Sequence, residues 1–479
     1  MRSPERRLVD GQEEPSVPLS EGDVNLSSRR RDWQDTEIDP ETAYWLQEDA
    51  RCFLHQSLST PCLNVLAGAD GARIEDLQGR KFLDFHGNSV HQVGFGNDRV
   101  IGAVIEQMRA LPFCSRRYTN IPAIRLAQRL TDLAPAGLSR VLFAPGGAEA
   151  VGIALKLARL ATGRYKTISL WDSFHGASLE AVSVGGEALF RQGMGPLMPG
   201  AQHVPPPTPR QCRFGCEGLC RLRCADYIDY VMEKEGDVAA VIAEPIRSTV
   251  VTMPPPGYWQ RVREICDRHG ALLIFDEIPV CLGRTGRMFA SETVGVTPDI
   301  LVIGKGLGGG VIPMAAVIAR EDLNVAGGLA LGHYTHEKSP LGAAAAMATL
   351  DCIEEDGLAE RASELGSYTL DRLRSMQREY PIIGDVRGVG LLIGIEMVTP
   401  TGQPAAGEAD QVMYDALKAG LSFKVSGGNV ITLTPPLTIT RAELDEALDI
   451  LERCIAKAAP LRAVIAQKEE RNGSHAGGI

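Results

Sequence analysis

The stretch ALLIFDEIPVCLGRTGRMFASETVGVTPDILVIGKGLGGG, Ala271–Gly310, decides the fold. An apolar run at 272–275 leads into Asp276, and a second apolar run at 300–303 leads into Lys305, which stands among glycines. Short apolar runs of this kind are typical of buried parallel strands. Because open α/β sheets bind ligands at the carboxyl ends of such strands, both charged side chains are predicted to lie at a functional edge.

A carboxylate and a lysine at two strand ends are the groups that pyridoxal phosphate chemistry requires. The lysine forms the Schiff base with the cofactor, and the carboxylate keeps the pyridine nitrogen protonated so that the ring accepts electrons. On spacing alone, other readings stay open. Most lysines are solvated surface groups, and an acidic residue after an apolar run is often a helix cap.

The same block resembles the signature of the class III aminotransferases, which are fold-type I pyridoxal-phosphate enzymes. Their pattern runs from an aspartate through Gly-Arg-Thr-Gly, here 283–286, and Pro-Asp, here 298–299, to Lys-Gly at Lys305. The resemblance implies an α/β fold, with a large domain whose mainly parallel seven-stranded sheet is flanked by helices, and a smaller α+β domain. It also implies pyridoxal 5'-phosphate as the cofactor, with Lys305 and Asp276 as the catalytic residues.

The composition is that of an ordinary globular protein and excludes several classes. The 479 residues are 44% hydrophobic and 23% charged, which allows a large core and more than one domain. The net charge of -11, without a basic stripe, argues against a nucleic-acid partner. No apolar run could span a bilayer, and the charged N-terminus lacks the apolar core of a signal peptide. We therefore expect a cytoplasmic protein without membrane contacts, whose eleven cysteines are mostly reduced.

Helical and extended patterns alternate through the first two thirds of the chain. Helices are predicted over 123–133 and 148–161, and strands over 140–143, 166–170 and 238–243. This order of elements favours a mainly parallel sheet.

The regions before and after this alternating part have other patterns. The stretch 76–96 predicts a short antiparallel unit with a glycine turn. After Leu341 a long helix is predicted, followed by a strand pair in 384–398 and a further strand in 429–440. The expected division is a partly disordered N-terminal arm (1–40), an N-terminal part of the small domain (41–100), a large cofactor domain (101–340), the C-terminal part of the small domain (341–460) and a tail (461–479).

A glycine turn stands between a predicted strand and a predicted helix. Gly146, Gly147 and Ala148 lie there, and glycines at a helix N-terminus expose backbone N–H groups that favour an anion. Such a turn alone is usually only a turn. In the family it is the turn that cradles the cofactor phosphate, where Ser-Gly is usual. With Gly146-Gly147 in this chain, the serine hydroxyl that would contact the phosphate is missing. The backbone amides must therefore make more of the hydrogen bonds to the phosphate.

Further cofactor contacts are implied by the resemblance. The element WDSFHG at 171–176 resembles the family's aromatic-His-Gly element, so Phe174 is expected to stack on the pyridine face next to His175, with plain core packing as the alternative. Ile278 would cover the opposite ring face. Glu244 ends another predicted strand and resembles the family's Glu-Pro element.

Thr335, in Gly-His-Tyr-Thr, resembles the threonine that reaches the cofactor phosphate of the neighbouring subunit. This reading predicts a homodimer with a shared active site. An ordinary loop hydroxyl is the alternative.

Four departures from the family pattern point to a specialised substrate. Thr432 stands where amino-acid-using members usually carry an arginine that clamps the α-carboxylate. Pro279 offers no donor where glutamine is usual. Arg247 also replaces a frequent glutamine, and it is expected either to bind an anionic substrate group or to pair with a surface acid. The loop 336–340 replaces a Gly-Gly-Asn-Pro run.

These departures suggest a small-molecule amine that lacks an α-carboxylate and carries a phosphonate or phosphate. The segments TPCLNVL, RRYTN, WDSFHGAS and GHYTHEKSP resemble most the subgroup of ammonia-lyases that act on (R)-1-hydroxy-2-aminoethylphosphonate and release phosphonoacetaldehyde and ammonia. The alternative is a transaminase acting on an ω-amine or an amino acid, which needs an oxo-acid acceptor. A non-catalytic relative is disfavoured by the intact Lys305, Asp276 and Phe174, and no dinucleotide-binding or Walker glycine pattern is present.

A cysteine row recurs at every fourth residue, with members at positions Cys212, Cys216, Cys220 and Cys224. Four thiols could bind zinc, although paired ligands are usually two residues apart. Free or oxidisable thiols in a loop are the alternative. No metal is expected in the reaction itself, because the chemistry belongs to the cofactor.

Overall fold

The computed structural model describes residues 28–56, 62–210, 212–216 and 220–458. A seven-stranded sheet forms its largest layer, with strand order β4-β10-β9-β8-β7-β5-β6. All neighbours are parallel except β10, which is antiparallel to β4 and to β9. The strands are β4 (Leu138–Ala144), β5 (Lys166–Leu170), β6 (Ala201–Val204), β7 (Val238–Ala243), β8 (Leu272–Asp276), β9 (Ile300–Ile303) and β10 (Ala315–Arg320).

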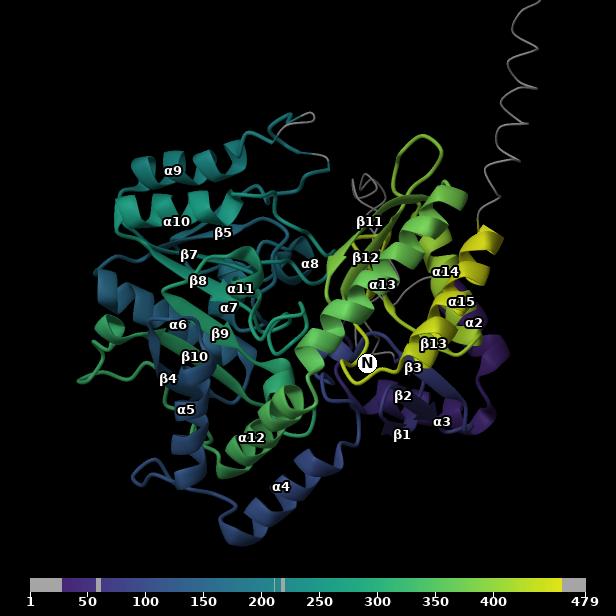
Figure 1. The fold of residues 1–479 in the computed structure, drawn as a ribbon, viewed down its shortest axis with the longest axis horizontal. Coiled ribbons are helices and arrows are strands. Elements are labelled where there is room, and N and C mark those ends of the chain that lie inside the picture. The colour runs from purple at the N-terminus through teal and green to yellow at the C-terminus, as the bar shows by residue number, and fades with distance from the viewer. Residues whose placement is uncertain (1–27, 57–61, 211, 217–219, 459–479) are drawn as a thin grey trace, which may run out of the picture.

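Helices and short turns connect these strands and the two smaller sheets (Figure 1). The helices are α2 (Ser28–Glu37), α3 (Pro40–Cys52), α4 (Asp98–Ala110), α5 (Ile121–Leu133), α6 (Gly147–Thr162), α7 (Leu179–Val184), α8 (Ala188–Arg191), α9 (Arg223–Glu235), α10 (Tyr258–His269), α11 (Ala290–Val294), α12 (Pro340–Glu355), α13 (Leu358–Glu379), α14 (Ala406–Lys418) and α15 (Arg441–Ala458). The 3-10 turns are η1 (Gly87–Ser89), η2 (Lys305–Gly308) and η3 (Glu321–Leu323).

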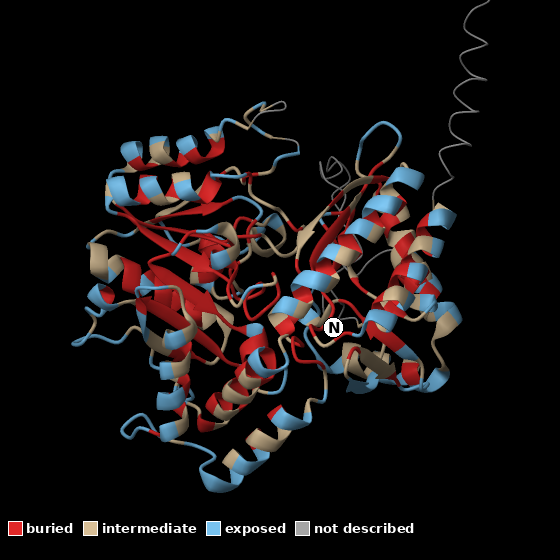
Figure 2. Ribbon diagram, in the orientation of Figure 1, coloured by how far each residue is buried: buried red, intermediate tan, exposed pale blue. Residues whose placement is uncertain are grey.

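The large sheet is buried on both faces because its strands are apolar throughout. All residues of β7, β8 and β9 are buried, and alternate side chains enter different cores. Val241 and Leu273 belong to the core that includes α9 and α10, whereas Ile242 and Ile274 belong to the core that includes α6. Helices therefore cover both faces, and Figure 2 shows the sheet as the buried centre of that part of the molecule. Each such side chain stabilises the fold by about 1.5–3 kcal/mol relative to exposure.

Two four-stranded sheets lie beside the large one. The first has the order β1-β2-β3-β13 and the second β11-β12-β15-β14. Their strands are β1 (Leu66–Asp70), β2 (Arg73–Asp76), β3 (Lys81–Asp84), β11 (Ile383–Val389), β12 (Leu392–Met397), β13 (Leu421–Ser422), β14 (Lys424–Ser426) and β15 (Val430–Leu433).

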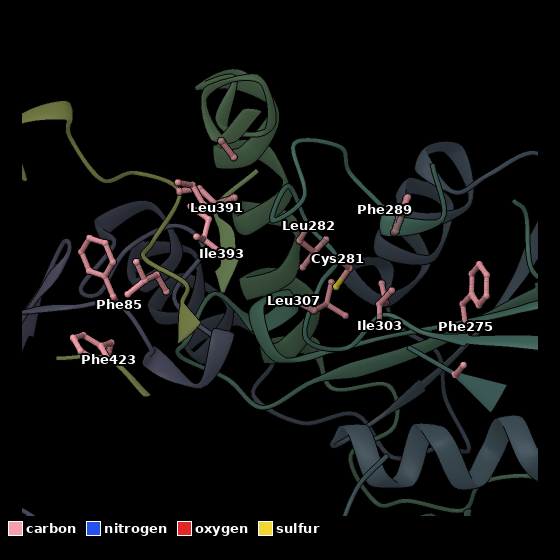
Figure 3. Close-up of a cluster of buried hydrophobic side chains, with 14 of the residues drawn as sticks. Phe85, Phe275, Cys281, Leu282, Phe289, Ile303, Leu307, Leu391, Ile393 and Phe423 are labelled. Atoms are coloured by element: carbon pink, nitrogen blue, oxygen red, sulfur yellow. The ribbon is translucent and has the colours of Figure 1, made fainter. Parts of the chain in front are cut away.

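One hydrophobic core joins the large sheet to the smaller ones. Figure 3 shows side chains from both regions in this core, including Leu307 of η2, Leu391 before β12 and Phe85 after β3. The turn that begins with Lys305 is therefore held between the large sheet and the N- and C-terminal segments. This packing positions the functional edge that the sequence predicts.

The predicted elements are largely confirmed, with several differences. The parallel seven-stranded sheet is present, and the helices α5, α6 and α12 begin within two residues of their predicted starts. The strand pair predicted in 384–398 is β11 and β12, and the glycine turn after Asp76 joins β2 to β3. The short strands β6, β13 and β14 and the buried strand β10 are not predicted from the sequence. Strand β10 has a continuous apolar pattern but no functional residue beside it.

The structure describes only the last part of the expected N-terminal arm, residues 28–40. Residues 1–27 and the tail 461–479 lie outside the described residues. Residues 28–37 form α2, and its Trp33 is only 1% exposed because it packs with Phe82 and Tyr414. This end of the predicted arm is therefore part of the folded structure. No helix in the described ranges is both long and apolar enough to cross a membrane.

Candidate active site

Asp276 and Lys305 lie at the carboxyl ends of neighbouring parallel strands. β8 pairs with β9 so that Asp276 lies opposite Val302, and Lys305 begins η2 directly after β9. Both functional side chains therefore lie at one edge of the sheet, as the sequence predicts.

Asp276 is held by a buried histidine. The Nδ1 atom of His175 lies 2.7 Å from Oδ2 of Asp276, and both side chains are almost completely buried. The backbone N–H of Ile278 donates to the other carboxylate oxygen at 3.2 Å. The other ring nitrogen of His175 lies 3.5 Å from the hydroxyl of Ser169 on β5. These contacts fix one orientation of the carboxylate, with the histidine as its positioning partner.

Lys305 is an exposed residue whose positive charge is nevertheless disfavoured. Burial lowers its pKa, while the carboxylates of Glu244 and Asp276 raise it and the charge of Lys424 lowers it again. The side chain still keeps access to solvent. A lowered pKa leaves more of the amine neutral, which is the form that attacks a carbonyl carbon or accepts a proton.

The backbone at Lys305 is strained. Its φ angle is 48°, in the left-handed region that costs residues other than glycine roughly 1–2 kcal/mol. The core around η2 must hold this conformation, because Gly306 and Leu307 are both buried. The strain therefore fixes where the reactive side chain leaves the backbone.

The glycine turn before α6 packs directly against the edge that carries Asp276 and Lys305. Gly146 caps α6 without any side-chain hydrogen bond. A Cβ atom at Gly147 would lie 2.8 Å from Cδ1 of Ile278, and a Cβ at Gly304 would lie 3.5 Å from Cγ1 of the same side chain. Ile278 thus lies between the helix N-terminus and the lysine turn.

A second close approach joins this turn to the segment after β5. Gly176 has a φ angle of +124°, and a Cβ there would lie 2.7 Å from Cβ of Ala148. Only glycine permits this contact, which brings Phe174 and His175 next to the start of α6. Phe174 is half-buried, and its ring contacts Phe190 at a centroid distance of 4.4 Å. It lies outside the described core clusters, and its stacking on the cofactor stays a prediction.

Glu244 and Arg247 follow the end of β7. Burial raises the pKa of Glu244, and the charge of Arg247 opposes this shift. Arg247 donates from Nε to the hydroxyl of Thr249 at 2.9 Å and lies 3.5 Å from the carboxylate of Glu187. Its Nη1 atom is buried without a hydrogen-bond partner. The predicted pairing with an acid is therefore present, and one donor group is still unused.

Thr432 lies in β15, opposite Lys424 of β14. Its hydroxyl donates to the backbone carbonyl of Thr249, and the side chain is 5% exposed. Arg247 and Thr432 are therefore linked through Thr249.

Two residues whose charges interact with Lys305 are not predicted from the sequence. His86 follows β3, and burial together with the charges of Lys424 and Lys305 lowers its pKa to about 4. Lys424 is the second, and its charge also acts on Lys305. The His-Gly-Asn sequence after an apolar strand could have indicated the histidine. The lysine has no local signal, because its position depends on strand pairing with a distant segment.

Thr335 is exposed in the turn before α12. Its expected role requires a second copy of the chain, so that role stays a prediction.

The cysteine row consists of four free thiols. Cys224 is buried in α9, and the other three are half-buried in the loop before it. Residues 217–219 between them lie outside the described residues. Within the described part of the chain, no group of three or more His, Cys, Asp or Glu side chains could hold a metal ion.

The described residues fit pyridoxal phosphate. The N-terminus of α6 offers backbone N–H groups for a phosphate, and Gly147 leaves a cradle that a Cβ would fill. Asp276 would supply a carboxylate for the ring nitrogen, and Lys305 would supply an amine whose pKa is lowered by burial. Phe174 is a half-buried ring beside the same turn.

Comparisons with known proteins agree with this arrangement. The class III aminotransferase model matches residues 56–455. An (R)-1-hydroxy-2-aminoethylphosphonate ammonia-lyase from Vibrio splendidus (strain 12B01) is 49% identical over 455 residues, covering 91% of this chain and 95% of the relative. A leucine/methionine racemase from Thermococcus litoralis is 37% identical, covering 86% and 95%.

The solved structures lead to the same family. The structure of an amine transaminase from an uncultivated Pseudomonas species, in its PLP-bound form, is 33% identical to this chain. It has a TM-score of 0.79 and covers 85% of this chain and 99% of its own. The chain therefore belongs to the class III aminotransferase family, with a fold-type I architecture and pyridoxal 5'-phosphate as the cofactor that this family implies.

Proposed function

We propose that this protein is an ammonia-lyase that converts (R)-1-hydroxy-2-aminoethylphosphonate to phosphonoacetaldehyde and ammonia. The 49% identity to the Vibrio splendidus lyase, over nearly the full length of both chains, carries the proposal. The environment of Thr432 supports it. A threonine whose hydroxyl is engaged by Thr249 cannot provide the two-donor clamp that an α-carboxylate requires.

Each site residue has a separate role around the cofactor. Bound pyridoxal phosphate supplies an electron sink that stabilises negative charge on the carbon bearing nitrogen. Lys305 holds the cofactor and removes the proton from that carbon. Asp276, oriented by His175, keeps a proton on the ring nitrogen. Phe174 and Ile278 would hold the ring of the cofactor.

The remaining cofactor contacts come from two segments. Gly146, Gly147 and Ala148 hold the phosphate through backbone N–H groups. Glu244 contributes a buried carboxyl group beside the reactive lysine.

The reaction balances without an oxidant or a second substrate. Loss of the proton from the carbon bearing nitrogen is followed by departure of the hydroxyl from the neighbouring carbon. The hydroxyl leaves with a proton as water, and one water is taken up when the released enamine is hydrolysed to the aldehyde and ammonia. A transaminase instead needs an oxo acid as the acceptor of the amino group.

The deciding experiment is a product assay on the holoenzyme with (R)-1-hydroxy-2-aminoethylphosphonate and no oxo acid. We expect ammonia and phosphonoacetaldehyde in equal amounts over many turnovers, and no products from Lys305→Ala. Turnover only after pyruvate or 2-oxoglutarate is added, with an amine donor, would refute the lyase and establish the transaminase.

The assembly and the location are part of the same proposal. The protein works in the cytoplasm as a homodimer in which Thr335 contacts the cofactor phosphate in the partner's site. Loss of cofactor affinity in Thr335→Ala, with the dimer intact in sedimentation, supports this role. Unchanged affinity refutes it.

A further inference from the structure

Lys424 points toward the same segment as Thr432. The two residues are paired in the antiparallel ladder of β14 and β15, and residues that lie opposite each other in such a ladder project from the same face. The direction of that face is fixed by Thr432, whose hydroxyl donates to the carbonyl of Thr249. Lys424 therefore projects toward the segment that follows β7.

This segment packs closely on the same face of the small sheet. Gly394 of β12 also lies opposite Thr432, and a Cβ there would lie 2.9 Å from Cβ of Val251. The chain from Arg247 to Val251 thus runs along the face that carries Lys424. Arg247 approaches from the large sheet, and Lys424 approaches from the small one.

Lys424 is also within electrostatic reach of the reactive lysine. Besides the dominant effect of burial, its charge lowers the pKa of Lys305 and that of His86. A cation at this site disfavours the charged form of Lys305 and so favours its neutral, reactive form.

The donors of Lys424 and Arg247 are not fully used. No hydrogen bond or ion pair within the described part of the chain engages the Lys424 ammonium group. The Nη1 atom of Arg247 is buried and has no partner either. A buried guanidinium donor without an acceptor is costly, so an acceptor that binds there would be stabilised.

We propose that Lys424 and Arg247 together bind the phosphonate group of the substrate, and that they replace the single arginine whose place Thr432 occupies. A phosphonate has three oxygens and up to two negative charges, so two separate cations suit it better than one planar fork. A lysine binds such a group as a point charge, and the arginine adds directional donors. The identity of the anion rests on the proposed function, whereas the two-cation site itself does not.

The test separates substrate binding from cofactor binding. Ethylphosphonate has no amine, so it reports anion binding to the holoenzyme without turnover. Its affinity is measured by calorimetry at fixed ionic strength for the wild type, Lys424→Met and Lys424→Arg. The control is Lys81→Met, because Lys81 is a strand lysine that is 62% exposed.

We expect Lys424→Met to weaken ethylphosphonate binding by about tenfold or more. Lys424→Arg should stay within a few-fold of the wild type, and Lys81→Met should not differ from it. In turnover assays Lys424→Met should raise KM far more than it lowers kcat. The affinity for pyridoxal phosphate should be unchanged.

Three results would overturn the inference. The first is equal ethylphosphonate affinity in the wild type and Lys424→Met. The second is a loss of pyridoxal phosphate affinity alone, which would assign Lys424 to the cofactor phosphate. The third is a wild type that does not bind ethylphosphonate. Phosphonate binding that depends on Lys424, in an enzyme that fails to release ammonia, would keep this inference and reject only the lyase. Ammonia release with an unchanged KM in Lys424→Met would do the reverse.

Discussion

The ring of His175 contacts the carboxylate of Asp276 at 2.7 Å, and both side chains are shielded from water. The histidine comes from the segment after β5 and the aspartate from the end of β8, two strands away in the sheet. The contact therefore locks two separate strand ends together. It also gives the aspartate a fixed direction before any ligand binds.

Asp276→Asn tests the charge of this pair. A neutral amide of the same shape cannot hold a proton on a ring nitrogen, so turnover should fall by about 10²–10⁴-fold. His175→Ala removes only the group that orients the Asp276 carboxylate, so its turnover should fall less than that of Asp276→Asn. Steady-state kinetics with saturating pyridoxal phosphate measure both variants. A larger loss in His175→Ala than in Asp276→Asn would contradict the assigned roles.

Glu277 should make the stability of the protein depend on pH. Burial raises its pKa from the ordinary 4.5 to about 7, although backbone N–H groups of Ala290 and Ser291 donate to it. For an acid whose pKa is raised by folding, the stabilising contribution is complete below pH 4.5 and is lost as the pH rises through 7. The free energy of unfolding should therefore fall between about pH 4.5 and 7, with a limiting slope of about 1.4 kcal/mol per pH unit.

Urea unfolding of Glu277→Gln checks this dependence. Asp84, whose pKa burial raises to about 6, contributes in the same direction, so the difference between wild type and variant is the relevant quantity. That difference should change with pH between about 4.5 and 7. A constant difference would show that Glu277 does not titrate in this window.

Gly366 and Gly102 form a matched pair of glycines within helices. A Cβ at Gly366 of α13 would lie only 2.0 Å from the carbonyl oxygen of Gly390, whereas nothing lies within 4 Å of a Cβ at Gly102 of α4. Gly366→Ala should destabilise the protein by about 1–3 kcal/mol. Gly102→Ala should stabilise it by about 0.5–1 kcal/mol. Thermal and urea unfolding measure both, and equal effects would mean that α13 can move away from the turn.

Thr432→Arg should change the preference among substrates. The new guanidinium would provide the missing carboxylate clamp, but it would lie opposite Lys424 in the sheet, where two like charges repel. We expect phosphonate turnover to drop by about tenfold or more, with amino acids gaining measurable transamination. Thr432→Val is the matched control, because it removes only the hydroxyl. Unchanged preference in Thr432→Arg would show that this position does not contact substrate.

The parts of the structure that follow from local pattern could be predicted. The apolar runs before Asp276 and Lys305 specify strands that are buried on both faces, and the glycines at 146–147 specify a helix start. Contacts across the chain could not be predicted this way. The partner of Arg247 is Glu187 on a separate segment, and nothing in the local sequence of either residue indicates it.

Lys424 is the clearest case of missing information. β14 has only three residues, which is too short for a periodic pattern. Its role becomes visible only when the register with Thr432 is known. In the sequence, threonine in place of arginine at position 432 indicates only the loss of a cationic side chain. The structure places a different cation, Lys424, on the adjacent strand.

The parallel pairing of Leu83 with Leu421 joins strands from opposite ends of the chain. During synthesis the edge of β3 that pairs with β13 stays unpaired until more than three hundred further residues have left the ribosome. An exposed strand edge is a template for wrong partners, and contacts this distant in sequence form slowly. Nascent or truncated chains that end before β13 should therefore be the species that chaperones retain and that aggregate when chaperones are scarce.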